Sequence, residues 1–511
     1  MKRPHDINER RGFLKSAGLA GATLSMTDFG FLGRLPAVSA ADTKLPSNAV
    51  EFSPDIEPLV RLLEDTPREQ VVETFAAKIQ SGTSYREVLA ALLLAGVRNI
   101  QPRPSVGFKF HAVLVVNSAH LASLNSPDSD RWLPIFWALD YFKSSQARDV
   151  QEGDWTMSAV DEASVPPSHR AKDAFRAAMD NWDVEAADTA IVALCRTAAA
   201  AEVFDVLAHY GCRDYRSIGH KAIYVANAYR TLQCIGWRYA EPVLRSLAYA
   251  LLNHEGQPNP ATHDLAPDAA WRVTHERLAS LPAEWSHGRL DAGATRDLLD
   301  TLRTASPSDA VAVTADLMVS GVAPQSINDA LFLSAAEMLA QQPGIVSLHA
   351  ATTTNALQYA YRTACGDETR RELLLQNAAF IPYFRESMQG RGNVAAKRIN
   401  VSDDAGESDG AASVDEIFAA VSSDRSRAAA DMQAFLASGG RPESLMHAAR
   451  RLVFLKGNDA HDYKFSSAAL EDFYAVSPQF RNAYLASSAY LLPGSKDRDN
   501  GLVDRVRDAL A

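Results

Sequence analysis

Four histidines stand where a helical chain could gather them around a metal ion. His111, His220 and His349 each open a stretch rich in alanine and other small residues, and His461 lies in the polar segment 456–465, which we expect to be a loop. Neutral imidazoles from separate helices are common ligands of iron, copper and zinc. Three or four of them around an ion with an open position suit dioxygen activation or a metal-bound hydroxide. We therefore expect these four residues to bind a transition metal, with iron or copper preferred to zinc.

The three helix starts resemble one another. Each places a histidine first and an asparagine six or seven residues later, in segments 110–117, 219–227 and 348–355. Small residues let packed helices approach closely, which would allow their first turns to converge. On a helical wheel, however, only the asparagine of the second segment shares the face of its histidine, and the other two lie about 120° away. Tyr224, four residues after His220, is on nearly the same face, and we expect it to orient a substrate or donate a proton.

Other interpretations of these residues remain open. A histidine at a helix start can simply hydrogen-bond a neighbouring turn. Glu202, Asp205 and His209 are spaced to share one helical face, but a di-iron bundle needs two such helices and only one is present. An ion pair between Asp205 and His209, near the end of their helix, is the preferred interpretation.

Several widespread catalytic motifs are missing from the chain. The sequence has no G-x-G-x-x-G after a strand, no G-x-x-x-x-G-K-[ST], no G-x-S-x-G and no H-E-x-x-H. This disfavours nucleotide-binding sheets, serine hydrolases built on a nucleophile elbow, and zinc peptidases of the H-E-x-x-H type. Once these classes are set aside, a site built on histidine side chains remains.

The elements that must position the histidines are helices. Apolar residues recur at three-and-four spacing in alanine-rich stretches, and strand-like alternation is nearly absent. The pattern predicts helices over 71–80, 85–97, 186–209, 222–235, 242–252, 294–303, 326–340, 350–364, 415–437 and 443–455. The predicted fold class is all-α, a multi-helix globular bundle of packed antiparallel helices without a substantial sheet.

Composition limits the partners. The 511 residues carry a net charge of −11, and without residues 1–40 there remain 45 Lys and Arg against 59 Asp and Glu, a net charge of −14. An acidic surface disfavours nucleic acid and anionic lipid. The four cysteines include no C-x-x-C pair, so neither a disulfide framework nor a zinc ribbon is expected.

The amino-terminal run Arg10-Arg11-Gly12-Phe13-Leu14-Lys15 resembles the twin-arginine (Tat) export signal. Glu9 departs from the family, which usually has Ser or Thr before the arginine pair. The apolar stretch that follows is rich in Gly and Ala and contains Asp28, so it fits a signal peptide better than a membrane anchor. The resemblance implies cleavage after Ala40 or Ala41, contact with the Tat translocon, and a periplasmic or extracellular location. Many proteins exported folded by this route carry a cofactor.

Four parts of the chain are expected. These are a signal peptide (1–40), a helical body with a histidine-lined pocket (45–400), a mobile acidic loop (401–413) and a carboxyl-terminal helical segment packed on the body (414–511). The loop has no large apolar residue. No segment is expected to insert stably into a membrane.

Three short pieces of the chain resemble the histidine-bearing helices of the questin oxidase-like family: residues 219–224, 348–357 and 459–462. That family is helical and is linked to oxidative ring opening of Baeyer-Villiger type without an obvious flavin motif. The resemblance implies that His220 and His349 share one pocket and that the chemistry is oxidative. A nicotinamide cosubstrate would be out of place in the periplasm, so that part does not carry over.

The sequence therefore predicts a periplasmic, metal-dependent oxidoreductase of the oxygenase or oxidase kind, acting on a small organic molecule. Two alternatives remain. One is a cofactor-free helical scaffold or binding protein, and the other is a hydrolytic metalloenzyme.

Overall fold

The computed structural model describes residues 49–401, 412–457 and 459–511, and within these ranges it contains 22 α-helices and no β-strand. An isolated bridge pairs Arg289 with Val322. The all-α prediction is confirmed. The twin-arginine motif, the expected signal peptide (1–40) and residues 402–411 of the expected acidic loop lie outside the described residues.

The helices follow one another along the chain in numbered order. The first eleven are α2 (Glu57–Asp65), α3 (Val71–Gln80), α4 (Tyr85–Asn99), α5 (His111–Leu124), α6 (Leu133–Glu152), α7 (Ala171–Asp180), α8 (Val184–Thr197), α9 (Ala200–Gly211), α10 (His220–Ile235), α11 (Ala240–Leu251) and α12 (Ala269–Leu278). The others are α13 (Ala292–Leu302), α14 (Pro307–Val319), α15 (Pro324–Gln341), α16 (Ile345–Thr363), α17 (Asp367–Gln389), α18 (Val414–Val421), α19 (Arg425–Ala437), α20 (Pro442–Lys456), α21 (Ala460–Ala475), α22 (Pro478–Ser487) and α23 (Leu502–Leu510).

Two predicted helices are in fact pairs of helices. The predicted helix 186–209 breaks after Thr197, and the predicted helix 415–437 breaks at Ser422. The second break has a local cause, because the Asp424 side chain caps α19 by accepting from the Arg427 backbone N–H. The first has no side-chain cap at Ala199, so packing rather than local sequence decides where α9 begins.

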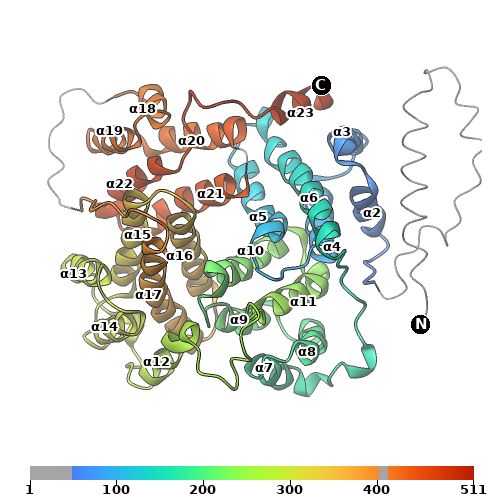
Figure 1. Ribbon diagram of the computed structural model, residues 1–511, viewed down its shortest axis with the longest axis horizontal. Helices are drawn as coiled ribbons and strands as arrows, with labels where there is room; N and C mark the ends of the chain where they lie inside the picture. The colour runs from blue at the N-terminus through green and yellow to red at the C-terminus, as the bar shows by residue number, and fades with distance from the viewer. Residues whose placement is uncertain (1–48, 402–411, 458) are drawn as a thin grey trace, which may run out of the picture. The chain divides into compact units, whose positions relative to one another are not determined.

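Four helices form the centre of the fold and carry the four histidines. Helix α5 packs against α10, α10 against α16, α16 against α21, and α21 against α5, which closes a ring in the middle of Figure 1. His111 and His220 are the first residues of α5 and α10, His461 is the second of α21, and His349 is the fifth of α16. The amino-terminal ends of all four helices therefore meet at one end of the ring.

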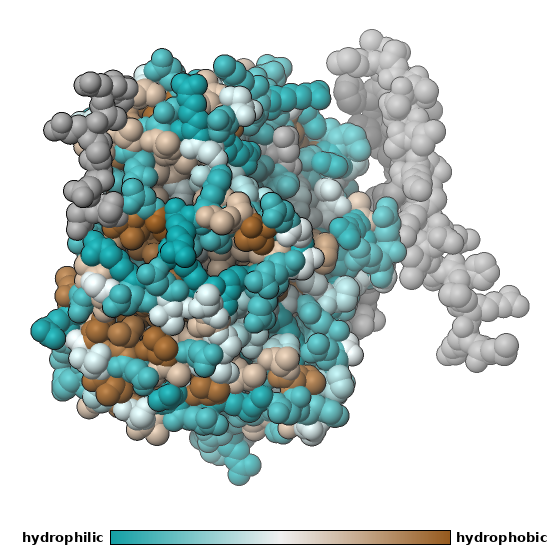
Figure 2. Space-filling view, turned by 60° about the vertical axis from the view of Figure 1, so that its left-hand side comes forward, coloured by the Kyte–Doolittle hydropathy of each residue, from teal (hydrophilic) through white to brown (hydrophobic). Residues whose placement is uncertain are grey.

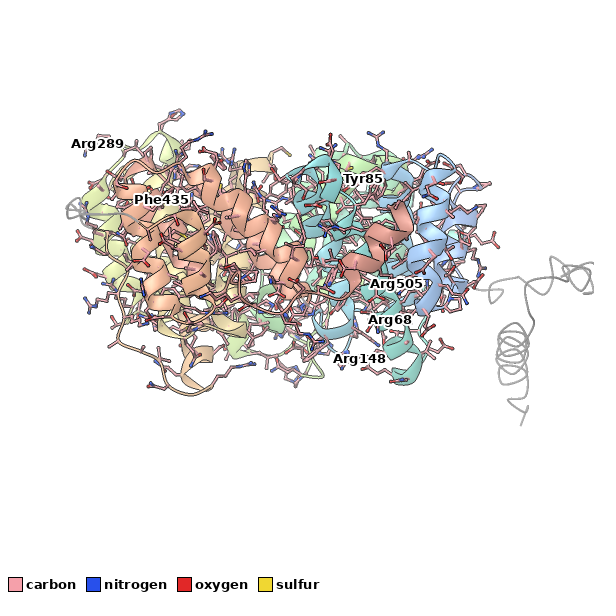
Figure 3. All side chains as sticks on the ribbon, turned by 90° about the horizontal axis from the view of Figure 1, so that it is seen from above. Arg68, Tyr85, Arg148, Arg289, Phe435 and Arg505 are labelled. Carbon is pink, nitrogen blue, oxygen red and sulfur yellow. The ribbon has the colours of Figure 1, made fainter. Side chains whose placement is uncertain are left out.

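Residues 50–511 form one compact unit. Helix α21 of the carboxyl-terminal segment belongs to the central ring, and α23 packs against α3. Arg505 of α23 forms an ion pair with Glu73 of α3 (2.6 Å), and Figure 3 shows the labelled Arg505 beside the first helices of the chain. The two ends of this unit are thus joined side by side.

The surface is polar over most of the face in Figure 2, where apolar side chains form separate patches. Leu290 and Val319 are among the large apolar residues that are exposed. In the part of the chain that the structure describes, none of the helices has the length and apolar character needed to span a bilayer.

Candidate metal centre

The structure brings three of the four predicted ligands into direct contact. The Nε2 atom of His220 lies 2.9 Å from Nε2 of His111 and 2.8 Å from Nε2 of His349. The ring centroids are 4.3 Å apart for His220 and His349, 4.9 Å for His111 and His220, and 6.4 Å for His111 and His349. Within the described ranges, this triad is the one group of three metal-binding side chains whose ligand atoms all lie within 4.8 Å of one another.

Backbone carbonyls fix which nitrogen carries the proton in two of the three rings. The Nδ1 of His220 lies 2.5 Å from the Ser217 carbonyl, and the Nδ1 of His349 lies 2.6 Å from the Ile345 carbonyl. Because a carbonyl can only accept a hydrogen bond, Nδ1 must be the protonated nitrogen of His220 and of His349. The Nε2 atoms of these two rings therefore present lone pairs at the centre of the triad.

Converging lone pairs repel unless a cation or a proton donor lies among them. Backbone carbonyls that hold Nδ1–H are the usual outer partners of metal-binding histidines. Two nitrogens that bind one ion at about 2.0–2.1 Å are about 2.9 Å apart at a right angle and about 3.3 Å apart at the tetrahedral angle. The observed separations of 2.8 and 2.9 Å are close to the lower value. The donor set thus fits a transition metal after shifts of a few tenths of an ångström.

The backbone before His220 adopts an unusual conformation that aims its ring. Ser217, Ile218 and Gly219 all have positive φ, at 56°, 53° and 82°. Positive φ is rare for a β-branched residue such as Ile218, and such strain tends to persist where function needs it. A Cβ on Gly219 would lie 2.2 Å from Oγ1 of Thr353, so this turn is pressed against α16. The turn places the Ser217 carbonyl within hydrogen-bonding distance of Nδ1 of His220.

Burial keeps the three imidazoles neutral. His111, His220 and His349 are 6%, 3% and 1% exposed. Burial lowers the pKa of each ring well below the ordinary 6.5, and the positive charge of Lys464 lowers it further. Unprotonated imidazoles are the form that binds metals.

His461 stands beside the triad as a fourth imidazole. Its ring centroid is 4.6 Å from that of His111 and 5.3 Å from that of His349. Its Nδ1 lies 3.3 Å from the Asp459 carboxylate, while its Nε2 is buried and has no hydrogen-bond partner. A carboxylate behind the outer nitrogen is another common support for a metal-binding histidine.

The segment around His461 is a helix start and not the polar loop that the sequence suggested. The Asp459 side chain accepts from the His461 backbone N–H and caps α21, which begins at Ala460. This corrects the position of His461, which is in the first turn of a central helix.

Lys464 was not identified from the sequence as a site residue, yet its side chain contacts two of the three imidazoles. It is 3% exposed, and its Nζ lies 3.4 Å from Nε2 of His220 and 3.5 Å from Nε2 of His349. Burial lowers the pKa of Lys464 to about 7. The signal was its spacing, because a residue three positions after His461 shares its face once the segment is known to be helical.

The three asparagines that follow the histidines meet around one small cavity. Asn117 donates to Asn227 (3.3 Å), and Asn355 donates to Asp472 (2.6 Å). All three line the cavity together with Lys464. On the helical wheel, two of these asparagines lie on a different face from their histidines. Each helix of the ring contacts two neighbours, however, so more than one of its faces points to the interior. The polar seam therefore continues from the triad along the ring.

Tyr224 does not reach the triad through its hydroxyl group. The hydroxyl donates to the Val243 carbonyl of α11 (3.4 Å), and the ring packs edge-on against Phe110 with centroids 5.0 Å apart. Burial raises the pKa of Tyr224 far above 10. Its observed contacts are those of a core residue.

Glu202, Asp205 and His209 do not form a common site. His209 pairs with the buried Glu372 of α17 (2.6 Å), and the Asp205 carboxylate accepts from the Gly366 backbone (2.7 Å). Glu202 pairs with Lys172. The expected pair between Asp205 and His209 is therefore wrong, because each finds a partner across a helix interface that the sequence spacing does not reveal.

Comparisons of the chain with protein-family models, with curated proteins and with solved structures find no match.

Proposed function

We propose that this protein is a metal-dependent oxidoreductase whose metal is bound by His111, His220 and His349, with His461 adjacent. One observation carries the proposal. Nε2 of the buried His220 lies 2.9 Å from Nε2 of His111 and 2.8 Å from Nε2 of His349, while backbone carbonyls occupy the Nδ1 sides of His220 and His349. Such a set of nitrogen lone pairs is best suited to bind a divalent transition metal.

Iron or copper at this position would supply redox chemistry and activate dioxygen. The chain's own residues do the remaining work. The helix ends exclude bulk water from the triad, and the carbonyls of Ser217 and Ile345 hold the ring orientations. Asp459 orients His461, and Lys464 is the proton-bearing group nearest to the centre.

The oxidative class and the location are supported by sequence. The resemblance of segments 219–224, 348–357 and 459–462 to the questin oxidase-like family favours an oxygenase or oxidase acting on a small organic molecule. The twin-arginine motif favours folded export to the periplasm, which allows a metal to be installed beforehand. Both remain part of the proposal.

Metal analysis of the protein purified from the periplasm tests the proposal. We expect close to one equivalent of iron or copper, and its loss in His220→Ala and in His349→Ala. His120→Ala is the matched control, because His120 is a buried histidine of α5 that bonds Tyr85 instead of the triad. A wild-type metal content below about a tenth of an equivalent would refute the proposal, since three aligned imidazoles should retain a transition metal through purification.

A second candidate is a cofactor-free helical scaffold or binding protein. The observation in its favour is that Lys464 already contacts two of the three Nε2 atoms. A protonated lysine could act as the donor to these lone pairs. Under this alternative, the His220→Ala variant would lose stability but the wild-type protein would carry no metal.

A further inference from the structure

A cleft of about 230 Å³ opens on the surface between α5, α20 and α21. Helix α21 packs against both α5 and α20, and the three helices lie together in the upper half of Figure 1. Leu121 of α5, Val453 and Phe454 of α20, and Leu470 of α21 give the cleft apolar walls. The cleft is smaller than the pockets of about 300–1,000 Å³ that bind drug-sized ligands, so it suits a smaller organic molecule.

Charge is not balanced inside this cleft. Among the described residues, two charged side chains line it, Arg450 and Glu471. The Glu471 carboxylate lies 2.8 Å from Nη2 of Arg230 and accepts a hydrogen bond from Asn355 (2.9 Å). Arg450 forms neither an ion pair nor a hydrogen bond with any residue that the structure describes. The cleft therefore holds one positive charge without a counter-charge, in a chain whose net charge is −11.

The position of Arg450 makes its unpaired charge unfavourable. The side chain is half-buried, and burial lowers the pKa of its guanidinium group. A partly desolvated charge is stabilised when an opposite charge reaches it. The planar guanidinium group matches the two oxygens of a carboxylate, with which it forms two parallel hydrogen bonds. An anionic ligand would therefore complete the cleft.

The neighbouring side chains narrow the class of anion. Phe454 follows Arg450 by four residues on α20, so an aromatic side chain lies beside the arginine on one helix face. Tyr474 adds a second ring, which is 55% exposed. Aromatic rings pack favourably against one another. Glu471 repels a group with two negative charges, such as a phosphate monoester, more strongly than a carboxylate.

We propose that this cleft binds a small aryl carboxylate, with the carboxylate on Arg450 and the ring between the apolar walls. The site goes beyond the proposed metal centre. The described residues that line the cleft include neither Lys464 nor any of the four histidines, so binding here needs no metal.

Benzoate and benzamide are the main probes, since they have nearly the same shape and differ in charge. Isothermal titration of the purified full-length protein should show benzoate binding at least about tenfold more tightly than benzamide, as expected for a charge-assisted contact. Acetate, which lacks the ring, and phenyl phosphate, which carries the higher charge, should both bind more weakly than benzoate.

Three variants locate the ligand. Arg450→Met removes the charge and should lose the preference for benzoate over benzamide. Arg451→Met is the matched control, because Arg451 is the exposed neighbour of Arg450 on α20 and does not line the cleft. It should bind benzoate as the wild type does. Leu121→Trp narrows the cleft from the α5 side and should weaken benzoate binding.

The outcomes that would overturn the proposal are distinct. Benzoate that binds no more tightly than benzamide, or equally well to Arg450→Met, shows that Arg450 does not recognise a carboxylate. Acetate or phenyl phosphate that binds as tightly as benzoate contradicts the aryl carboxylate class. Unchanged benzoate binding in Leu121→Trp places the ligand outside this cleft.

The two proposals fail independently. A metal-free preparation refutes the proposed function alone, because this titration needs no metal. A failed titration refutes the binding site alone. Should a variant fail to fold, the comparison of benzoate with benzamide on the wild-type chain still decides.

Discussion

Gly107→Ala perturbs the proposed metal centre without removing a ligand. Gly107 is buried against the imidazole of His220, and a Cβ at this position would lie 3.0 Å from Cε1, 3.4 Å from Nδ1 and 3.5 Å from Nε2. Gly107 has a φ of −99° and a ψ of −147°, and this ψ lies outside the broad β region that other residues prefer. The added methyl group therefore acts on the ring and also strains the turn that carries it.

The size of the effect follows from these distances. A carbon–carbon contact of 3.0 Å must open by about half an ångström to reach ordinary van der Waals separation. The His220 ring must move by that amount or rotate about its bond to the Ser217 carbonyl. Losses of 10–100-fold in metal affinity are typical when the support of one ligand is disturbed, which corresponds to about 1.4–2.7 kcal/mol.

Competition with a chelator measures this affinity directly. We expect Gly107→Ala to hold its metal about 10–100-fold more weakly than the wild type. Gly501→Ala is the control, because Gly501 has a φ of −64° and open space around its Cβ position. Equal metal affinity in Gly107→Ala and the wild type would refute the argument that His220 is held in a metal-binding position by its surroundings.

Three further substitutions test neighbouring parts of the structure. Gly219→Ala combines a φ of 82° with a Cβ 2.2 Å from Oγ1 of Thr353, so it should lower the thermal midpoint and release the metal; an unchanged midpoint would contradict the turn described here. Tyr224→Phe removes a hydrogen bond to the Val243 carbonyl and should cost about 1 kcal/mol of unfolding free energy with unchanged metal content, whereas metal loss would tie Tyr224 to the site. Lys143→Met tests a pH effect, because burial lowers the pKa of Lys143 from 10.5 to about 8. Between these two values the unfolded chain binds more protons than the folded protein, so the unfolding free energy of the wild type should rise with pH. Relative to the variant, the rise should reach up to about 3 kcal/mol. Parallel pH profiles of unfolding free energy for the two proteins would show that Lys143 does not titrate in this way.

The sequence reveals the histidines of the triad because each stands at the start of a helix of small residues. Side chains lean toward the amino terminus of their helix, so His111 and His220, the first residues of α5 and α10, project past their helix ends. His349 is the fifth residue of α16 and reaches the same point from the second turn, with its Nδ1 on the Ile345 carbonyl. Tyr224 illustrates the limit of the same reasoning. It shares a face with His220 but sits one turn further in, where α11 and Phe110 surround it.

The parts of the structure that the sequence did not predict depend on contacts between distant segments. Lys464 could not be assigned because the segment 456–465 was interpreted as a loop, although Asp459 is a capping residue one position before the helix. The partner of His209 is Glu372, 163 residues further along the chain, and the local spacing of residues does not predict this pair. Such pairs are set by helix packing, which a single sequence does not specify.

The central claim is that His111, His220 and His349 bind one transition-metal ion through their Nε2 atoms. Anomalous diffraction above the absorption edges of iron and copper, on crystals of the purified protein, tests this most directly. The account predicts one peak at the triad, about 2.0–2.3 Å from each of the three Nε2 atoms. Density that shows the imidazoles in place without such a peak, with Nζ of Lys464 hydrogen-bonded among them, would contradict it.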